Sequence, residues 1–236
     1  MSTLGRTRFL LAAGLALLAA SAGSAGATDE CQGLQTCVPV AGPWVVVPTA
    51  AGTTRPQVEY QLACPKGFVV GGTDVEVSDR EIDVVFLGRS GSPVNPGVTT
   101  SRAIVFVASY VGGKPAGPSF RPHIGCLPAA GGGGRVPTAL TPFTLGQPTV
   151  RRVRQVRLAP GARTVVQGCA RDERLVGGWS AVGFYQPTPP PPALAAAVSS
   201  VRGTRGGRVV ARVESGPVVS GVRAVLQIGA VCAGGT

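Results

Sequence analysis

Two stretches of the chain carry the same pattern, Cys64-Pro-Lys-Gly-Phe-Val-Val-Gly-Gly72 and Cys169-Ala-Arg-Asp-Glu-Arg-Leu-Val-Gly-Gly178, in which two glycines follow a cysteine. From Gly72 to Cys126 the chain takes 54 steps, and from Gly178 to Cys232 it takes 54 steps again. An offset of 106 residues therefore aligns the two segments without a gap. We expect the second half of the chain to repeat the fold of the first half.

The six cysteines are even in number, which is typical of disulfides in an exported chain. Each repeat opens and closes with a cysteine, and this selects one pairing among the many that six cysteines allow. The predicted bridges are Cys64–Cys126 and Cys169–Cys232, one in each repeat, with Cys31–Cys37 closing a small N-terminal loop. No C-x-x-C pair is present, so the sequence gives no support to redox catalysis or zinc binding.

The residues between these cysteines have the pattern of many short strands. Glycine (35 residues) and proline (21 residues) separate short valine-rich runs. The expected strands are 44–48, 58–63, 68–77, 82–88, 103–110 and 122–127 in the first repeat, and 164–168, 175–185, 208–214 and 223–231 in the second. The sequence thus predicts an all-β protein of two tandem repeat domains, each a β-sandwich or small β-barrel.

Residues 1–27 have the layout of a secretory signal peptide, with a basic start, an apolar run of about a dozen residues and small residues up to Ala27. We expect cleavage near Ala27 and a secreted, periplasmic or envelope-associated protein. The apolar run is shorter than a bilayer span, and no transmembrane segment is expected. The predicted domains are 28–130 and 137–236, joined by a glycine-rich linker at 131–136.

The formal net charge of +11 is concentrated in the second domain. Residues 28–136 contain eight acidic and eight basic side chains, whereas residues 137–236 contain three acidic residues and twelve arginines. The densest basic patch comprises Arg151, Arg152, Arg154 and Arg157, where a β-bulge near Arg151 would reconcile the valine spacing with a strand. Such a patch attracts polyanions, although an inert basic surface would have the same sequence. No aromatic residues are interleaved with these arginines, so specific nucleic-acid binding is not indicated.

An acidic cluster in the first domain offers a second candidate site. Its five carboxylates could supply the oxygen ligands of Ca²⁺, the only cofactor that the sequence suggests. The alternative is a solvated strand face, because the spacing matches no known calcium loop. The cluster comprises Asp74, Glu76, Asp79, Glu81 and Asp83.

No motif in the sequence indicates a particular enzymatic activity. A secreted hydrolase would have to use the same carboxylates or the sole histidine, His123, and no nucleophile motif accompanies them. The proline run at 187–192 could be presented to another extracellular protein, as in an inhibitor, or serve as a plain spacer. The sequence favours a non-catalytic binding or envelope-associated module whose partner is an anionic envelope polymer.

Overall fold

The structure is a computed structural model that describes residues 28–34, 36–49, 56–87, 102–113, 117–129 and 149–234. These residues form thirteen strands, one short α-helix and one 3-10 helix, so the all-β prediction is confirmed. The expected signal peptide (1–27) and the expected linker (131–136) lie outside the described residues. We refer below to residues 28–129 as the first half and to residues 149–234 as the second half.

The first half contains seven strands around one hydrophobic core. Strands β1, β2 and β4 pair with β7, and strands β3 and β5 pair with β6. The core between these two layers centres on Tyr60, Phe106 and Phe120, which are at most 1% exposed. The strands are β1 (Val38–Ala41), β2 (Trp44–Val46), β3 (Gln57–Ala63), β4 (Phe68–Val77), β5 (Ile82–Leu87), β6 (Ala103–Tyr110) and β7 (Ser119–Pro128).

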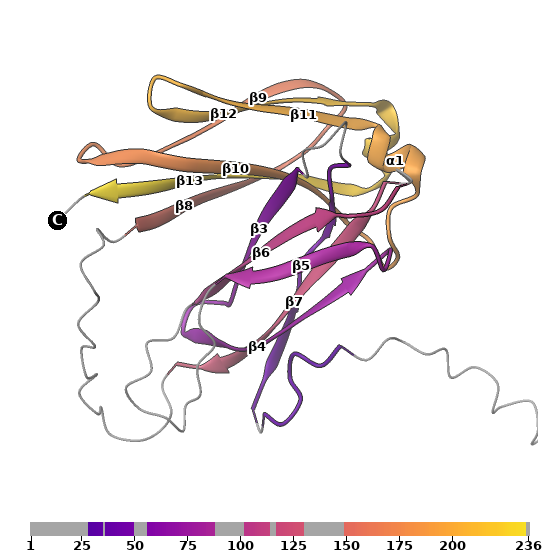
Figure 1. Cartoon of the computed structure of the whole chain (residues 1–236), viewed down its shortest axis with the longest axis vertical. Coiled ribbons are helices and arrows are strands. Elements are labelled where there is room, and N and C mark those ends of the chain that lie inside the picture. Colours follow the sequence, from indigo (N-terminus) through magenta and orange to yellow (C-terminus); the bar gives the residue numbers. More distant parts are fainter. Residues whose placement is uncertain are drawn as a thin grey trace, which may run out of the picture.

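The second half contains six strands and a core of its own. Strands β8 and β10 pair with β13, and strands β9 and β11 pair with β12. Figure 1 shows these two layers one above the other, with the first half running obliquely beneath them. The elements are β8 (Thr149–Arg157), β9 (Gly161–Gly168), β10 (Glu173–Tyr185), α1 (Pro192–Ala196), β11 (Val198–Arg205), β12 (Arg208–Ser215), the 3-10 helix η1 (Pro217–Gly221) and β13 (Arg223–Gly234).

The strands of the two halves pair in the same order. The orders β2-β7-β4 and β3-β6-β5 in the first half correspond to β8-β13-β10 and β9-β12-β11 in the second. Both halves contain a β-bulge at the double glycine, between Val70 and Gly72 in β4 and between Leu175 and Gly177 in β10. These registers match Gly72 with Gly177, so the sequence alignment with Gly178 is wrong by one residue.

The connections between equivalent strands differ in length, and this overturns the gapless alignment. Four residues separate β4 from β5, whereas residues 186–197, with the proline run and α1, separate β10 from β11. Conversely, β11 and β12 are joined by a tight turn in which Gly206 and Gly207 have φ of 57° and 68°, while β5 ends at Leu87 and β6 begins at Ala103. The proline run therefore precedes a strand rather than replacing one, and Leu194 of α1 is buried in the second core.

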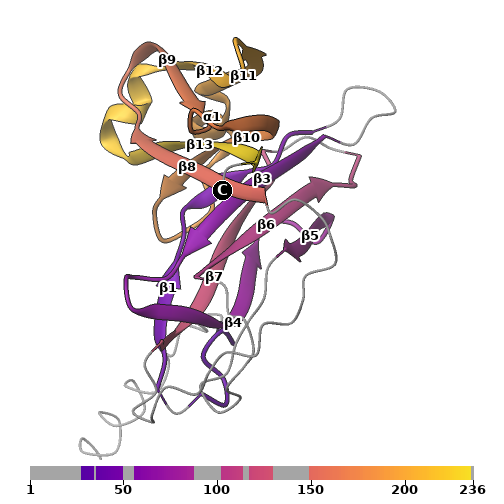
Figure 2. The same ribbon diagram turned by 90° about the vertical axis from the view of Figure 1, so that its left-hand side faces the viewer.

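One sheet runs through both halves. Strand β2 pairs with β7 at Val45 and Phe120, and it pairs with β10 at Val45 and Gly183. Figure 2 shows the second half seated on one end of the first. Ala181 of β10 is part of the first-half core, although each half keeps a hydrophobic core of its own. The sequence did not predict this shared sheet.

A polar network fixes the contact between the halves. The Gln227 side chain accepts a hydrogen bond from the Gln61 backbone N–H (2.7 Å) and donates one to the Gln61 carbonyl (2.9 Å). Its Oε1 atom also accepts a bond from the Trp179 indole N–H (3.3 Å). The amide of Gln227 therefore pairs with strand β3 as a further strand would, and it satisfies backbone groups at the edge of that sheet.

The three disulfides connect the predicted partners. Cys64–Cys126 and Cys169–Cys232 close the two halves, and Cys31–Cys37 closes the N-terminal loop. There are thus three bridges rather than one for each half, because the first half contains two. Long loops closed by a covalent bond restrict the unfolded chain, which is the usual source of disulfide stabilisation.

Candidate functional site: the arginines of the second half

Strand β8 carries the predicted basic patch in regular extended geometry. Its register against β13 is unbroken from Thr149 to Arg157, so the expected bulge near Arg151 is wrong. Side chains of a regular strand alternate between its faces, which sends Arg151 and Arg152 to opposite sides. The valines at every third position fall on alternate faces, and Val156 packs partly against the second core.

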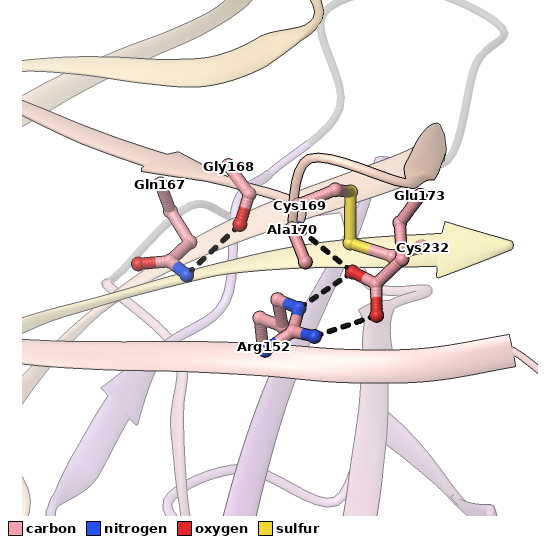
Figure 3. The surroundings of a disulfide bond; sticks show 7 residues. All are labelled: Arg152, Gln167, Gly168, Cys169, Ala170, Glu173 and Cys232. Atoms are coloured by element: carbon pink, nitrogen blue, oxygen red, sulfur yellow. Dashed lines mark hydrogen bonds and ion pairs between the residues drawn. A yellow bond between two sulfur atoms is a disulfide. The ribbon is translucent and has the colours of Figure 1, made fainter. Parts of the chain in front are cut away.

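Two of the four patch arginines are held by carboxylates. Arg151 contacts Glu59 of the first half at 2.7 Å and lies 4.7 Å from the Trp179 ring centroid. Arg152 donates two hydrogen bonds of 2.6 Å to Glu173, beside the Cys169–Cys232 bridge (Figure 3). Hydrogen bonds from Arg152 and the Ala170 backbone N–H lower the pKa of Glu173 to about 2. Arg151 and Arg152 are thus engaged in ion pairs within the protein, while Arg154 and Arg157 are exposed.

A second group of arginines lies on the outer face of the β9-β12-β11 sheet. Arg205 of β11 stands directly opposite Arg208 of β12, across the Gly206–Gly207 turn. Arg212 lies four residues further along β12 on the same face, and all three side chains are exposed. Within the described ranges, none of the three forms an ion pair. We call Arg205, Arg208 and Arg212 the outer arginine face.

This face brings Arg205 and Arg208 together at one end of the sheet, while its one acidic residue, Glu214, lies two residues beyond Arg212. Like charges directly opposite each other on a sheet repel and destabilise the pair. The aliphatic part of the Arg208 side chain packs over Gly168 on the neighbouring strand. A Cβ atom added to Gly168 would lie 3.2 Å from the Arg208 Cγ. A shallow depression of about 310 Å³ lies beside the turn, between Arg205 and the bulge of β10 at Gly177. An anionic group at this tip would relieve the repulsion between Arg205 and Arg208.

From the sequence we singled out the patch Arg151, Arg152, Arg154 and Arg157, and we counted the outer arginine face only among the twelve arginines of the second half. The dipeptide Gly206-Gly207 between two strand-like runs is a signal for a tight hairpin. That signal could have placed Arg205 and Arg208 opposite each other before the structure was known.

The five carboxylates of the predicted calcium site do not converge. Among the described residues, no three of their oxygen atoms lie close enough together to hold a common ion. Asp74 accepts the Asp29 and Val75 backbone N–H groups, at 2.8 and 2.7 Å. Asp79 accepts the Glu81 N–H at 2.9 Å, and Glu81 accepts the Tyr110 hydroxyl at 3.0 Å. Burial, together with the carboxylates of Glu81 and Asp79, raises the pKa of Tyr110 to about 12. Asp83 is exposed on β5.

The sole histidine is buried between two carboxylates. His123 of β7 is 5% exposed, with Nε2 3.1 Å from Glu76 Oε1 and Nδ1 3.9 Å from Glu30 Oε1. Glu30 is 4% exposed. Its backbone oxygen packs so closely against Gly72 and Gly125 that a Cβ atom on either glycine would clash with it. Burial is the main cause that lowers the pKa of His123. Because the ring is buried, this arrangement does not present a general base to a substrate.

Within the described part of the chain, the only cluster of three metal-ligand side chains is Cys169, Glu173 and Cys232. The sulfur atoms of this cluster are bonded to each other (Figure 3). A disulfide sulfur is not the thiolate that binds zinc or iron. The cluster is therefore explained by the disulfide and its neighbouring ion pair.

No helix in the described ranges is long and apolar enough to span a membrane. The chain matches no protein-family model, and no curated protein or solved structure is significantly similar to it.

Proposed function

We propose that this chain is an exported, non-catalytic binding protein that attaches to anionic polymers of the cell envelope through the outer arginine face. The observation that carries the proposal is the direct opposition of Arg205 and Arg208 on an exposed sheet, with Arg212 on the same face. A protein that bound nothing there would keep this repulsion without compensation. Phosphate or carboxylate groups spaced along a polymer would neutralise it.

The charge of the second half supports the same proposal. Twelve arginines against three acidic residues give residues 137–236 a net charge of +9. Ion pairs engage Arg151 and Arg152, and the remaining charge supplies a field that draws polyanions to this half from solution. Release of counterions from the polymer would add to the affinity and make it depend on salt.

Export and duplication are parts of the proposal. All six cysteines are paired in disulfides, which persist in oxidising compartments and are rare in the cytosol. The shared strand order and the two equivalent bulges support descent of both halves from one unit. Among the described residues, two arginines stand directly opposite each other on neighbouring strands only in the second unit, so we assign polymer binding to that unit.

The test uses the full chain and two triple variants of equal charge. The first variant replaces the outer arginine face (Arg205→Glu, Arg208→Glu and Arg212→Glu). The control replaces three other exposed arginines of the second half (Arg154→Glu, Arg171→Glu and Arg174→Glu). Each variant is applied to immobilised inorganic polyphosphate and eluted with salt, after its far-UV circular dichroism and melting temperature have been compared with those of the wild type.

We expect the wild type to bind, the control to elute at moderately lower salt and the face variant to flow through. Equal losses in the two variants would show that only net charge matters and would contradict an assignment to this face. Flow-through of the folded wild type at low salt would contradict the proposed function itself.

A further inference from the structure

Strand β11 is an open edge of its three-stranded sheet. It pairs with β12 alone, over eight residues without a bulge, and contains no proline. Within the described ranges, residues 199–205 make no backbone hydrogen bond outside that ladder. Proteins usually shorten, bend or cover such an edge, because its free N–H and C=O groups can pair with another chain. This edge has none of those protections.

A groove runs beside the open edge. It has a volume of about 420 Å³ and is bounded by Val198 and Arg202 of β11, Ala181 of β10, and Val46, Pro48 and Val58 of the first half. Val201 also borders the groove, but its side chain stands opposite Arg212 on the outer face of the sheet. The volume lies within the range of natural ligand sites, about 300–1,000 Å³. We call this feature the edge groove.

The charge of the edge groove is one-sided. Arg202 is the only charged residue that lines it, and no carboxylate faces it. One guanidinium nitrogen of Arg202 donates to the Gly178 carbonyl at 2.7 Å, which anchors the side chain across the opening between β11 and β10. The guanidinium has further N–H donors that this bond does not use. An occupant that matches this groove has apolar side chains and a carboxylate.

We propose that the edge groove binds an extended acidic peptide segment of a partner protein by strand addition to β11. The peptide backbone would bond the free edge of β11, and alternate side chains would enter the groove. A glutamate or aspartate opposite Arg202 would receive its free donors, while an apolar side chain opposite Val198 would contact the walls formed by Val46, Pro48 and Val58. This site is separate from the outer arginine face, whose side chains project from the sheet surface.

A second copy of the chain is the less favoured occupant. Pairing of β11 with its own copy would bring the positive charges of Arg202 and Arg205 from two molecules together, with no acidic residue on the strand to offset them. Like charges on adjacent strands are destabilising. An acidic segment replaces that repulsion by attraction.

The probe is the peptide TETVTVT-amide with fluorescein on its N-terminal amine, in which glutamate and both valines lie on one face of an extended chain. Matched peptides carry lysine in place of the glutamate or proline in place of the threonine between the two valines. Binding to the full chain is followed by fluorescence anisotropy, and the bound edge is located by amide hydrogen exchange resolved by NMR. The variant Arg202→Glu is compared with Arg171→Glu, a reversal of the same charge at an exposed site away from the groove.

We expect saturable binding of the acidic peptide and protection of alternate amides in β11, since strand addition uses every second residue. Arg202→Glu should weaken this binding by about tenfold or more, and the lysine peptide should recover it, whereas Arg171→Glu should have little effect. The proline peptide should bind poorly. Absence of binding by the acidic peptide, unchanged binding to Arg202→Glu, or protection outside β11 would overturn the proposal. Protection of β11 without peptide, in a protein that sediments as a dimer, would assign the edge to a second copy instead.

Discussion

The substitution Gln227→Met tests whether the polar network joins the two halves into one cooperative unit. Methionine has nearly the shape of glutamine but cannot replace its amide. The change removes the bonds of 2.7 and 2.9 Å to the Gln61 backbone and the bond of 3.3 Å from Trp179. Gln227 is 3% exposed and Trp179 1%, so water cannot simply take the place of the lost amide.

The expected cost follows from the groups left unpaired. A buried donor or acceptor that loses its partner costs about 1–3 kcal/mol. The Gln61 groups are only partly buried and belong at the low end of this range, so we expect a total loss of about 3 kcal/mol in the free energy of unfolding. For a protein of this size, about 2–4 °C in melting temperature accompanies each kcal/mol, which gives a decrease of about 6–12 °C.

Urea unfolding followed by both tryptophan fluorescence and far-UV circular dichroism measures this loss. Gln155→Met is the control, because Gln155 accepts one bond of 3.0 Å, from the Tyr60 hydroxyl, and is exposed. We expect the control to lose about 1 kcal/mol, because it removes one hydrogen bond instead of three. A loss below about 1 kcal/mol for Gln227→Met would refute the role of the network. Separate transitions for the two probes in the wild type would refute the single cooperative unit.

Three further predictions concern single positions. Gly229→Ala places a Cβ 2.1 Å from the Trp179 ring and should cost about 3 kcal/mol or more in thermal unfolding, whereas Gly203→Ala, which meets no atom within 4 Å, should cost less than about 1 kcal/mol. His123 is faced by Glu30, Asp74, Glu76 and Arg121, and its pKa in the folded protein lies below the ordinary value of 6.5. The neutral ring therefore makes its full contribution to the stability of the fold above pH 6.5. Stability should therefore fall as the pH drops below that value, and His123→Gln should remove this part of the pH dependence. In a double-mutant cycle, the partly exposed pair Glu59–Arg151 should contribute less than about 1 kcal/mol, and a larger value would show that it is more than a surface ion pair.

The cysteine pairing was predictable because each repeat contains one cysteine near its start and one near its end, so the same bridge is expected in both. The positions of Cys126 and Cys232 relative to the double glycines left one pairing consistent with both halves. The strands were predictable from valine-rich runs between glycines and prolines. Strand β11 was missed because its sequence, VSSVRGTR, contains only two strongly apolar residues.

The role of the basic patch was not predictable from local sequence. Glu59 lies 92 residues before Arg151, and only the tertiary fold brings this carboxylate to the arginine. The five carboxylates of the calcium hypothesis are separated for a related reason, since Asp74 and Glu76 share one face of β4 whereas Asp79 and Glu81 lie in the following turn and Asp83 lies on β5. The gapless alignment failed because an insertion before β11 offsets a deletion after it, so the total length hides both.

The salt dependence of polyphosphate binding tests the central claim most directly. Calorimetric titration of the full chain at several salt concentrations gives the slope of log K against log salt, which reports how many phosphates the protein neutralises. If the outer arginine face makes these contacts, replacement of Arg205, Arg208 and Arg212 by glutamine should reduce the slope by about 2–3, at a contribution of about 0.7–0.9 for each contact. The matched replacement of Arg154, Arg171 and Arg174 by glutamine should leave the slope close to that of the wild type. Equal slopes for the wild type and the face variant would contradict the proposed site.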